Sequence, residues 1–274
     1  MNIPSSNFKK VKQFNTVFGH PAPSNPVKDI FTTSPEVVKL RNSLIREEIE
    51  ELNQAYNDKD IVEIIDALSD ILYVAYGLLV VYGVDGDIKY TEHIDMKINT
   101  LGRSREDRVR KFCNFIQTKD YISRVVGISF ETTPVTFIDT LKEDNFKMLF
   151  DSHMRDLTIN LEELEKSTSE VSPSFSSVVS NCLSIIYITY LIGILIGVDL
   201  DTSVGLVHSS NMSKICSSEE EAEKTVAWYK ENETRYDSPK WRKADEGYVI
   251  FNESTGKILK NINYKAVDLT VMIN

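Results

Sequence analysis

The sequence predicts an all-α protein with a four-helix-bundle core and a small β-hairpin near its C-terminus. Residues 44–84 have the pattern of two helices, one amphipathic and one almost entirely apolar. A similar long apolar stretch ends at Asp199, which indicates a second helical pair. The tail differs, because residues 248–260 have the pattern of a small hairpin.

The first helical pair is marked by the spacing of its apolar residues. Residues 44–55 are rich in residues of high helix propensity, and residues 57–60 are expected to form a turn. The apolar stripe of the first helix is Ile45, Ile49, Leu52 and Tyr56. A longer helix is expected over residues 61–84, ending at Gly83. Its inward-facing residues are Ile64, Leu68, Ile71 and Leu72. Residues 71–82 are apolar on every side, which predicts complete burial.

A second copy of the pair is predicted farther along the chain. Residues 76–85 and 190–199 both end in Gly-Val-Asp, 114 positions apart. Two glutamate pairs match at the same offset: Glu48 with Glu162, and Glu51 with Glu165. Repeated helical pairs bury their apolar faces against each other, so the two copies are expected to form one bundle.

The sequence therefore divides into three parts. We assign residues 1–105 to a first helical unit, residues 106–216 to a second, degenerate unit, and residues 217–274 to a tail.

Within the tail, residues 219–233 predict a charged helix and residues 237–242 predict a loop. Residues 248–251 are expected to pair with residues 257–260 as the hairpin.

The chain is acidic, with a formal net charge of −10 at pH 7. It lacks the basic stripe with which proteins neutralise a nucleic-acid backbone, so we expect no nucleic-acid partner. An acidic protein still binds a phosphorylated small molecule when a metal ion supplies the positive charge.

The cysteines and the apolar stretches indicate a cytoplasmic protein. Cys113, Cys182 and Cys216 are widely spaced, which predicts neither a zinc site nor a disulfide framework. The N-terminus lacks the apolar segment of a signal peptide. Residues 183–198 carry no charge but are shorter than a membrane span of roughly 18–20 residues. We expect a buried helix there and no membrane association.

A set of carboxylates lies on the two helices of the first unit. Glu48 and Glu51 share one helix face, and Glu63, Asp66 and Asp70 share another. Because uncompensated carboxylates are costly to bury, this region is expected to meet water or a cation. Oxygen ligands from two helices suit Mg²⁺, with Mn²⁺ as a possible substitute. The alternative is a solvated acidic face with salt bridges.

Residues 47–51 read EEIEE, and residues 66–73 read DALSDILY. Together they resemble the EExxE and ExxD signature of the all-α nucleoside triphosphate pyrophosphohydrolases. This superfamily includes MazG-like proteins, dimeric dUTPases and phosphoribosyl-ATP pyrophosphohydrolases. Residues 208–214, HSSNMSK, resemble the last of these branches. The resemblance covers most of residues 8–100 and recurs weakly over 110–215.

The resemblance implies three metal ligands, which are Glu48, Glu51 and Asp70. The first acid of the ExxD motif is missing, because Ala67 stands three residues before Asp70. Asp66 and Glu63 are the two candidates for the remaining ligand.

The second unit has lost most of this set. Serines stand where the acids of the second helix would be, at Ser177, Ser180 and Ser184. Asn211 and Lys214, in contrast, occur only in the second unit. These complementary losses predict one composite site, in which Lys214 supplies a point charge for phosphate. The alternative for Lys214 is an exposed lysine at a helix end.

The resemblance implies magnesium-dependent hydrolysis of a nucleoside triphosphate to a nucleoside monophosphate and pyrophosphate. Glu47 is the candidate general base, and Tyr73 is a candidate for stacking on the base or, alternatively, a core residue. Two other functions stay open: a catalytically weak nucleotide-binding or scaffold protein, and a phosphoribosyl-ATP pyrophosphohydrolase. The expected partner is the triphosphate substrate, and the composite site is compatible with a homodimer.

Overall fold

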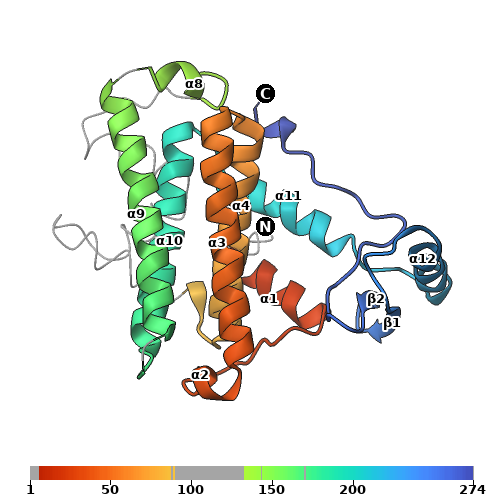
Figure 1. Cartoon of the computed structure of the whole chain (residues 1–274). Helices are drawn as coiled ribbons and strands as arrows, with labels where there is room; N and C mark the ends of the chain where they lie inside the picture. Colours follow the sequence, from red (N-terminus) through yellow and green to blue (C-terminus); the bar gives the residue numbers. More distant parts are fainter. Residues whose placement is uncertain (1–5, 88, 90–132, 143, 170, 274) are drawn as a thin grey trace, which may run out of the picture.

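The structure is a computed structural model that describes residues 6–87, 89, 133–142, 144–169 and 171–273 (Figure 1). Its core is a bundle of four long helices. These are α3 (Pro35–Asp58), α4 (Ile61–Val81), α9 (Asp144–Ser169) and α10 (Phe175–Ile196). Figure 1 shows α3 alongside α4 and α9 alongside α10. The predicted all-α bundle is therefore confirmed.

The first helical pair begins and ends where local chemistry dictates. Pro35 occupies the first turn of α3, where a missing backbone N–H costs nothing. Lys59 ends α3 in the left-handed conformation, and Asp60 then caps α4 by accepting from the backbone N–H groups of Val62 and Glu63. Gly83 follows α4 with a φ of +67°, as its predicted role as terminator requires.

The core of the bundle matches the predicted inward faces. Seven predicted core residues are less than 3% exposed: Ile45, Ile49, Leu52, Ile64, Leu68, Ile71 and Leu72. The predicted eighth, Tyr56, is only partly buried. Its hydroxyl donates to Asp151 Oδ1 on α9 over 2.8 Å.

Polar contacts join α3 to α9, and a mostly apolar surface joins α4 to α10. Arg46 on α3 forms an ion pair with Glu165, and Asn42 Nδ2 donates to Thr168 Oγ1 over 2.7 Å. On the other side, the Cys182 thiol donates to the Ala75 carbonyl. The two helical pairs thus form one continuous core.

Two further helices lie against α4 on the side away from α9. These are α1 (Asn7–Val17) and α11 (Leu200–Met212) (Figure 1). A buried hydrogen bond of 2.7 Å between Ser69 and Ser203 fixes α11 to α4. The short helices α2 (Ile30–Thr33) and α8 (Phe137–Thr140) lie in connections.

The tail contains α12 (Glu219–Asn232), strands β1 (Pro239–Ala244) and β2 (Gly247–Asn252), and the 3₁₀ helix η2 (Thr270–Met272). The predicted charged helix is confirmed. The predicted loop over residues 237–242 is wrong, because most of it is strand β1, which pairs antiparallel with β2.

The predicted hairpin partner of β2 lies on its other edge. Residues 257–260 reach β2 only through an isolated bridge between Phe251 and Ile258. Two backbone hydrogen bonds support that bridge, Asn252 N to Lys257 O and Leu259 N to Ile250 O. The turn between β1 and β2, at Asp245-Glu246, is too polar and too short to stand out in the sequence.

Helices α4 and α10 are long and apolar enough, by length and composition alone, to cross a membrane. The expectation that the second of them is too short is wrong, because α10 begins at Phe175, eight residues before the stretch 183–198, and is uncharged throughout. In the bundle, 83% of the apolar window of α4 and 72% of that of α10 are buried. Core helices of helical bundles have this composition, so burial accounts for it.

The predicted division of the chain is only partly visible. The boundary between residues 105 and 106, and with it Cys113, lies outside the described residues. Helices α9 and α10 occupy the place of a second helical pair, while their origin by duplication stays a prediction.

Candidate active site

The predicted carboxylates meet where α3 and α4 run side by side. Glu48 comes from α3 and Asp70 from α4, and both side chains are partly buried. One oxygen of Glu48, Oε2, is buried and has no hydrogen-bond partner. A buried carboxylate oxygen without a partner carries a desolvation cost that a bound cation would offset.

The electrostatics of the pair indicate a concentration of negative charge. Burial, together with the charges of Asp70, Glu51, Asp66 and Glu47, raises the pKa of Glu48 to about 8. Burial and the Asp66 charge likewise raise the pKa of Asp70 to about 7, although Lys214 opposes the shift. Like charges and desolvation both disfavour ionisation, so the pair holds protons near neutral pH.

The other predicted ligands differ in their positions. Asp66 is partly buried, and its pKa is raised by burial and by Glu63 and Glu51. Asp66 acts on both Glu48 and Asp70, whereas Glu63 is exposed and acts on neither. Asp66 therefore has the better position for the ligand that the sequence left open.

As the side chains stand, no three His, Cys, Asp or Glu residues in the described part of the chain are close enough to coordinate one ion. The donor set nevertheless fits a hard cation. It consists of carboxylate oxygens from two helices, they repel one another, and one of them is buried without a partner. Binding of a divalent cation would offset the two causes that raise both pKa values, burial and the repulsion between the carboxylates.

The end of α11 approaches the carboxylates from the second unit. Lys214 Nζ donates to Asn211 Oδ1 over 2.6 Å. Burial lowers the pKa of Lys214, while the Asp70 carboxylate raises it. Lys214 therefore lies within electrostatic reach of the predicted metal ligands in the same chain. The structure thus places Lys214 near Asp70 without a second copy of the protein, while the composite site stays a prediction.

Tyr73 lies between the two halves. It is only 7% exposed, and its hydroxyl is 3.0 Å from His208 Nδ1. A hydrogen bond to Asn211 also affects its titration, although burial dominates and raises the pKa of the phenol. The Phe14 ring packs edge-on against Tyr73 with centroids 5.7 Å apart. Tyr73 thus holds Asn211 and His208 in place from within the core.

The comparison with known proteins agrees with this geometry. Residues 11–94 match the family described as phosphoribosyl-ATP pyrophosphohydrolase. Residues 11–94 therefore form a domain of the phosphoribosyl-ATP pyrophosphohydrolase type, which belongs to the MazG-like superfamily. It is also 34% identical to uncharacterized protein L479 of Acanthamoeba polyphaga mimivirus over 265 residues, which are 95% of this chain and 93% of the relative. No solved structure matches the chain.

The pyrophosphohydrolase match covers the helices that carry the carboxylates but not the end of α11. Asn211 and Lys214 lie well beyond residue 94, so the interaction of Lys214 with Asp70 comes from the structure rather than from the family match. The match also does not extend to α9 and α10, which leaves the predicted duplication without support from the comparison.

Two residues at this site were not singled out from the sequence. His208 was given no role of its own within the HSSNMSK segment, but its Nδ1 lies 3.0 Å from the Tyr73 hydroxyl, and burial lowers its pKa to about 4. Its imidazole is therefore neutral at pH 7, and Nδ1 can accept a hydrogen bond from the Tyr73 hydroxyl. Arg41 precedes Glu48 by two helical turns on α3, and its guanidinium packs over Gly77 of α4. The spacing of seven residues was the only available signal for Arg41.

The glutamates of the second unit have other surroundings. Glu165 is engaged in the ion pair with Arg46, and Glu162 is exposed. We expect the double variant Glu162→Gln, Glu165→Gln to keep its turnover within about twofold, with a loss of stability below about 1 kcal/mol from the ion pair. Pyrophosphate release and a denaturation curve measure both quantities. A loss of turnover comparable to that of an Asp70 variant would contradict the single-site arrangement.

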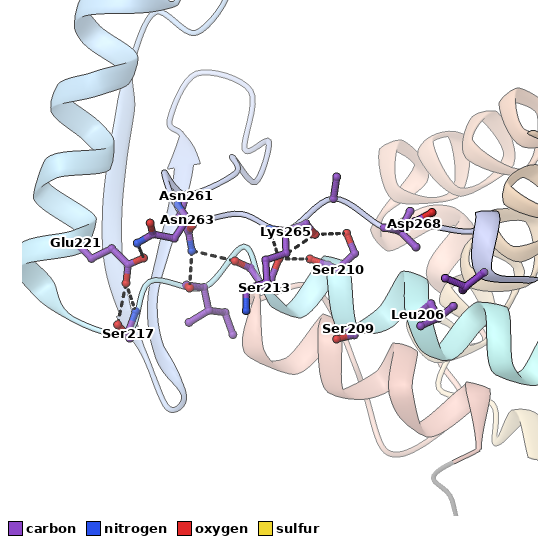
Figure 2. Close-up of a pocket in the computed structure, with 14 residues that line it drawn as sticks. Leu206, Ser209, Ser210, Ser213, Ser217, Glu221, Asn261, Asn263, Lys265 and Asp268 are labelled. Atoms are coloured by element: carbon purple, nitrogen blue, oxygen red, sulfur yellow. Dashed lines mark hydrogen bonds between the residues drawn. The ribbon is translucent and has the colours of Figure 1, made fainter. Parts of the chain in front are cut away.

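An open groove lies away from these residues, on the opposite face of α11 (Figure 2). Leu206, Ser210 and Ser213 line it from the helix, and the C-terminal segment closes it, with Ser210 Oγ donating to the Lys265 carbonyl over 2.9 Å. Asn211 and His208 project from the other side of α11. The groove is therefore not part of the carboxylate site.

The raised pKa values predict an unusual dependence of stability on pH in the absence of metal. Glu48 has an ordinary pKa of 4.5 when unfolded and about 8 when folded, so the folded state binds more protons between these values. The free energy of unfolding should therefore fall as pH rises from about 5 to about 8. Glu48→Gln should lessen this fall and raise Tm at pH 8 by on the order of 2–8 °C.

Calorimetry at pH 5 and pH 8 in the presence of a chelator measures this effect. Added Mg²⁺ should raise the Tm of the unsubstituted protein more than that of the variant. An equal difference in Tm between the two proteins at both pH values would contradict the assigned repulsion.

Proposed function

We propose that this chain is a magnesium-dependent nucleoside triphosphate pyrophosphohydrolase. The proposal rests on one observation above all: the Asp70 carboxylate interacts electrostatically with the carboxylates of Asp66 and Glu51 and with the Lys214 ammonium of the same chain. The metal-binding residues and the phosphate-binding residues that we propose therefore belong to one chain. The family match supports a pyrophosphohydrolase, and the triphosphate specificity and the metal are our additions.

The carboxylates of α3 and α4 would form the metal site. Glu48, Glu51 and Asp70 would hold Mg²⁺, with Asp66 favoured over Glu63 as the additional ligand. When bound, the ion offsets the negative charge that develops on the phosphate oxygens. Mn²⁺ is the expected substitute because it accepts the same oxygen ligands.

The remaining residues of the site would act on the attacking water and on the phosphates of the substrate. Glu47 is exposed beside Glu48, where it could accept a proton from the attacking water. The water oxygen forms a bond to the α-phosphorus, and the bond between that phosphorus and the α–β bridging oxygen breaks. Pyrophosphate leaves, and a nucleoside monophosphate remains. Lys214 and Asn211 would contact the phosphates. Tyr73, which is buried and hydrogen-bonded to His208, would position Asn211.

A panel of nucleoside triphosphates, canonical and modified, tests this proposal when monophosphate and pyrophosphate are measured together with and without Mg²⁺. Equal amounts of the two products are expected, and only with the metal. Phosphoribosyl-ATP belongs in the panel as a second candidate substrate, because the matching family carries that description. Absence of turnover on every substrate would favour the catalytically weak nucleotide-binding or scaffold protein instead.

The cellular location, the partners and the oligomeric state are further parts of this proposal. We propose a cytoplasmic enzyme that acts on free nucleotides, without nucleic-acid or membrane partners. Because Lys214 reaches the carboxylates within one chain, a homodimer is not needed to complete the site.

A further inference from the structure

The C-terminal hairpin places an arginine against the end of α1. Gly19 follows α1 with a φ of +68°, and the Arg242 guanidinium of β1 occupies the space that a Cβ at this position would need. Arg242 is partly buried. Among the described residues, no ion pair joins Arg242 to a carboxylate.

The hairpin is held firmly in this position. Val249 of β2 is fully buried in a cluster with Val17 and Phe18 at the end of α1. The backbones of Cys216 and Tyr248 exchange two hydrogen bonds of 2.9 Å, which join β2 to the segment that follows α11. A side chain on such a scaffold is preorganised, so Arg242 needs little ordering to bind a ligand.

Arg242 is one of two arginines that lie near His20. Arg41 lies on the same side, since a Cβ at Gly77 would be 2.9 Å from its Nη1. The Nε atom of Arg41 is buried and has no hydrogen-bond partner. Both arginines lie close enough to His20 to affect its titration. Burial and the charges of Arg41 and Arg242 together lower the pKa of His20 to about 4.

Two lysines of the tail extend this cluster to Lys214. Lys260 and Lys257 both lie close enough to add to the effect of burial in lowering the pKa of Lys214. The Lys214 ammonium lies 5.8 Å from the centre of the Phe14 ring, which in turn stacks on His20. Phe14 and His20 thus connect the lysine end of the cluster to the arginine end.

The gathering of these cations is informative because the protein carries a net charge of −10. In such a chain, carboxylates are available to pair with most basic side chains. Arg41 and Arg242 are partly buried, and among the described residues neither forms an ion pair with a carboxylate. Holding their charges near each other therefore raises the free energy of the ligand-free protein. A polyanion would offset this cost, and a site of this kind concentrates anions from solution.

We propose that the C-terminal hairpin completes the substrate site, and that Arg242, together with Arg41 and the tail lysines, binds the terminal phosphates of the triphosphate. The inference rests on the proposed function for the identity of the ligand. Arg242, Lys257 and Lys260 all lie outside the residues that match the pyrophosphohydrolase family. The hairpin would therefore make this chain select triphosphates over monophosphates.

Binding of inorganic pyrophosphate and of nucleoside monophosphate, measured by calorimetry on the full chain, tests the inference directly. Arg242→Gln, which removes the charge and keeps much of the side chain, should weaken pyrophosphate binding by about tenfold or more. The same substitution should change the affinity for nucleoside monophosphate by no more than about twofold. Lys243→Ala is the matched control, because Lys243 is the exposed neighbour of Arg242 on the same strand. It should bind pyrophosphate like the unsubstituted protein.

The outcomes separate this inference from the proposed function. Pyrophosphate binding that depends on Arg242, in a protein that hydrolyses no triphosphate, would retain the anion site and overturn the proposed reaction. Hydrolysis by a protein in which Arg242→Gln binds pyrophosphate like Lys243→Ala would overturn the inference alone. Failure of the unsubstituted protein to bind pyrophosphate would overturn it as well. An unchanged thermal melt of Arg242→Gln shows that the hairpin is still folded, and Arg242→Met, which also removes the charge, repeats the test if it is not.

Discussion

Replacement of Asp70 by Asn is expected to reduce magnesium-dependent hydrolysis by a factor of about 10³ or more, while the helical content stays unchanged. Asp70 lies in the centre of the site, where it interacts with Asp66 and Glu51 and with Lys214. The substitution keeps the shape of the side chain and removes its charge. Glu48→Gln and Glu51→Gln should act in the same direction, because both side chains belong to the same proposed ligand set.

Rates of pyrophosphate release and the affinity for Mg²⁺ measure this effect, and circular dichroism reports the fold. Glu50→Gln is the matched control, since Glu50 is an exposed carboxylate on the outer face of α3 whose ion-pair partner is Arg46. Without metal, Asp70→Asn should melt at a higher temperature than the unsubstituted protein, because one repelling charge is gone. Near-normal activity in this variant would remove Asp70 from the metal site.

Lys214→Ala should lower kcat/KM for a triphosphate by about 10²-fold and leave Mg²⁺ affinity within a few-fold of normal. The lysine is partly buried and already oriented by the Asn211 side chain, so its ammonium needs little reorganisation to meet a phosphate. Interactions with charge that develops in the transition state change turnover as well as binding. Both kinetic constants are therefore expected to move.

Steady-state kinetics and separate titrations with Mg²⁺ and with a triphosphate provide the test. Lys265→Ala is a suitable control, because Lys265 lines the groove on the opposite face of α11 (Figure 2). Lys214→Met preserves much of the packing against Phe14 and covers the case in which alanine loosens the end of α11. Equal loss of metal and triphosphate affinity would show that Lys214 supports the carboxylates rather than the substrate.

The bundle could be predicted because its signals are local. Helical spacing places Ile64, Leu68 and Ile71 on one face regardless of what packs there, and the structure buries all three completely. The hairpin was predicted with the wrong partner. Strand β1 carries Lys240 and Arg242 and is buried at few positions, so its sequence lacks the alternation that marks a half-buried strand.

The carboxylate half of the site was also predictable, for the same reason. Residues three or four apart on a helix share a face, so Glu48 and Glu51 are neighbours by geometry alone. The choice between Asp66 and Glu63 was not predictable. It depends on how α4 is rotated against α3, and that rotation is set by packing along both helices.

The sequence by itself determined the helical bundle, the carboxylates that line its first helical pair, and the resemblance that the family match confirms. Only the tertiary structure decided that Lys214 faces Asp70 within one chain, that His208 supports Tyr73, and that Arg242 lies against Gly19 beside α1. The physical reason is the range of the forces involved. Helix periodicity acts over a few residues, whereas these contacts join segments separated by more than a hundred residues, and they form only when buried apolar surfaces fix the helices and the hairpin together.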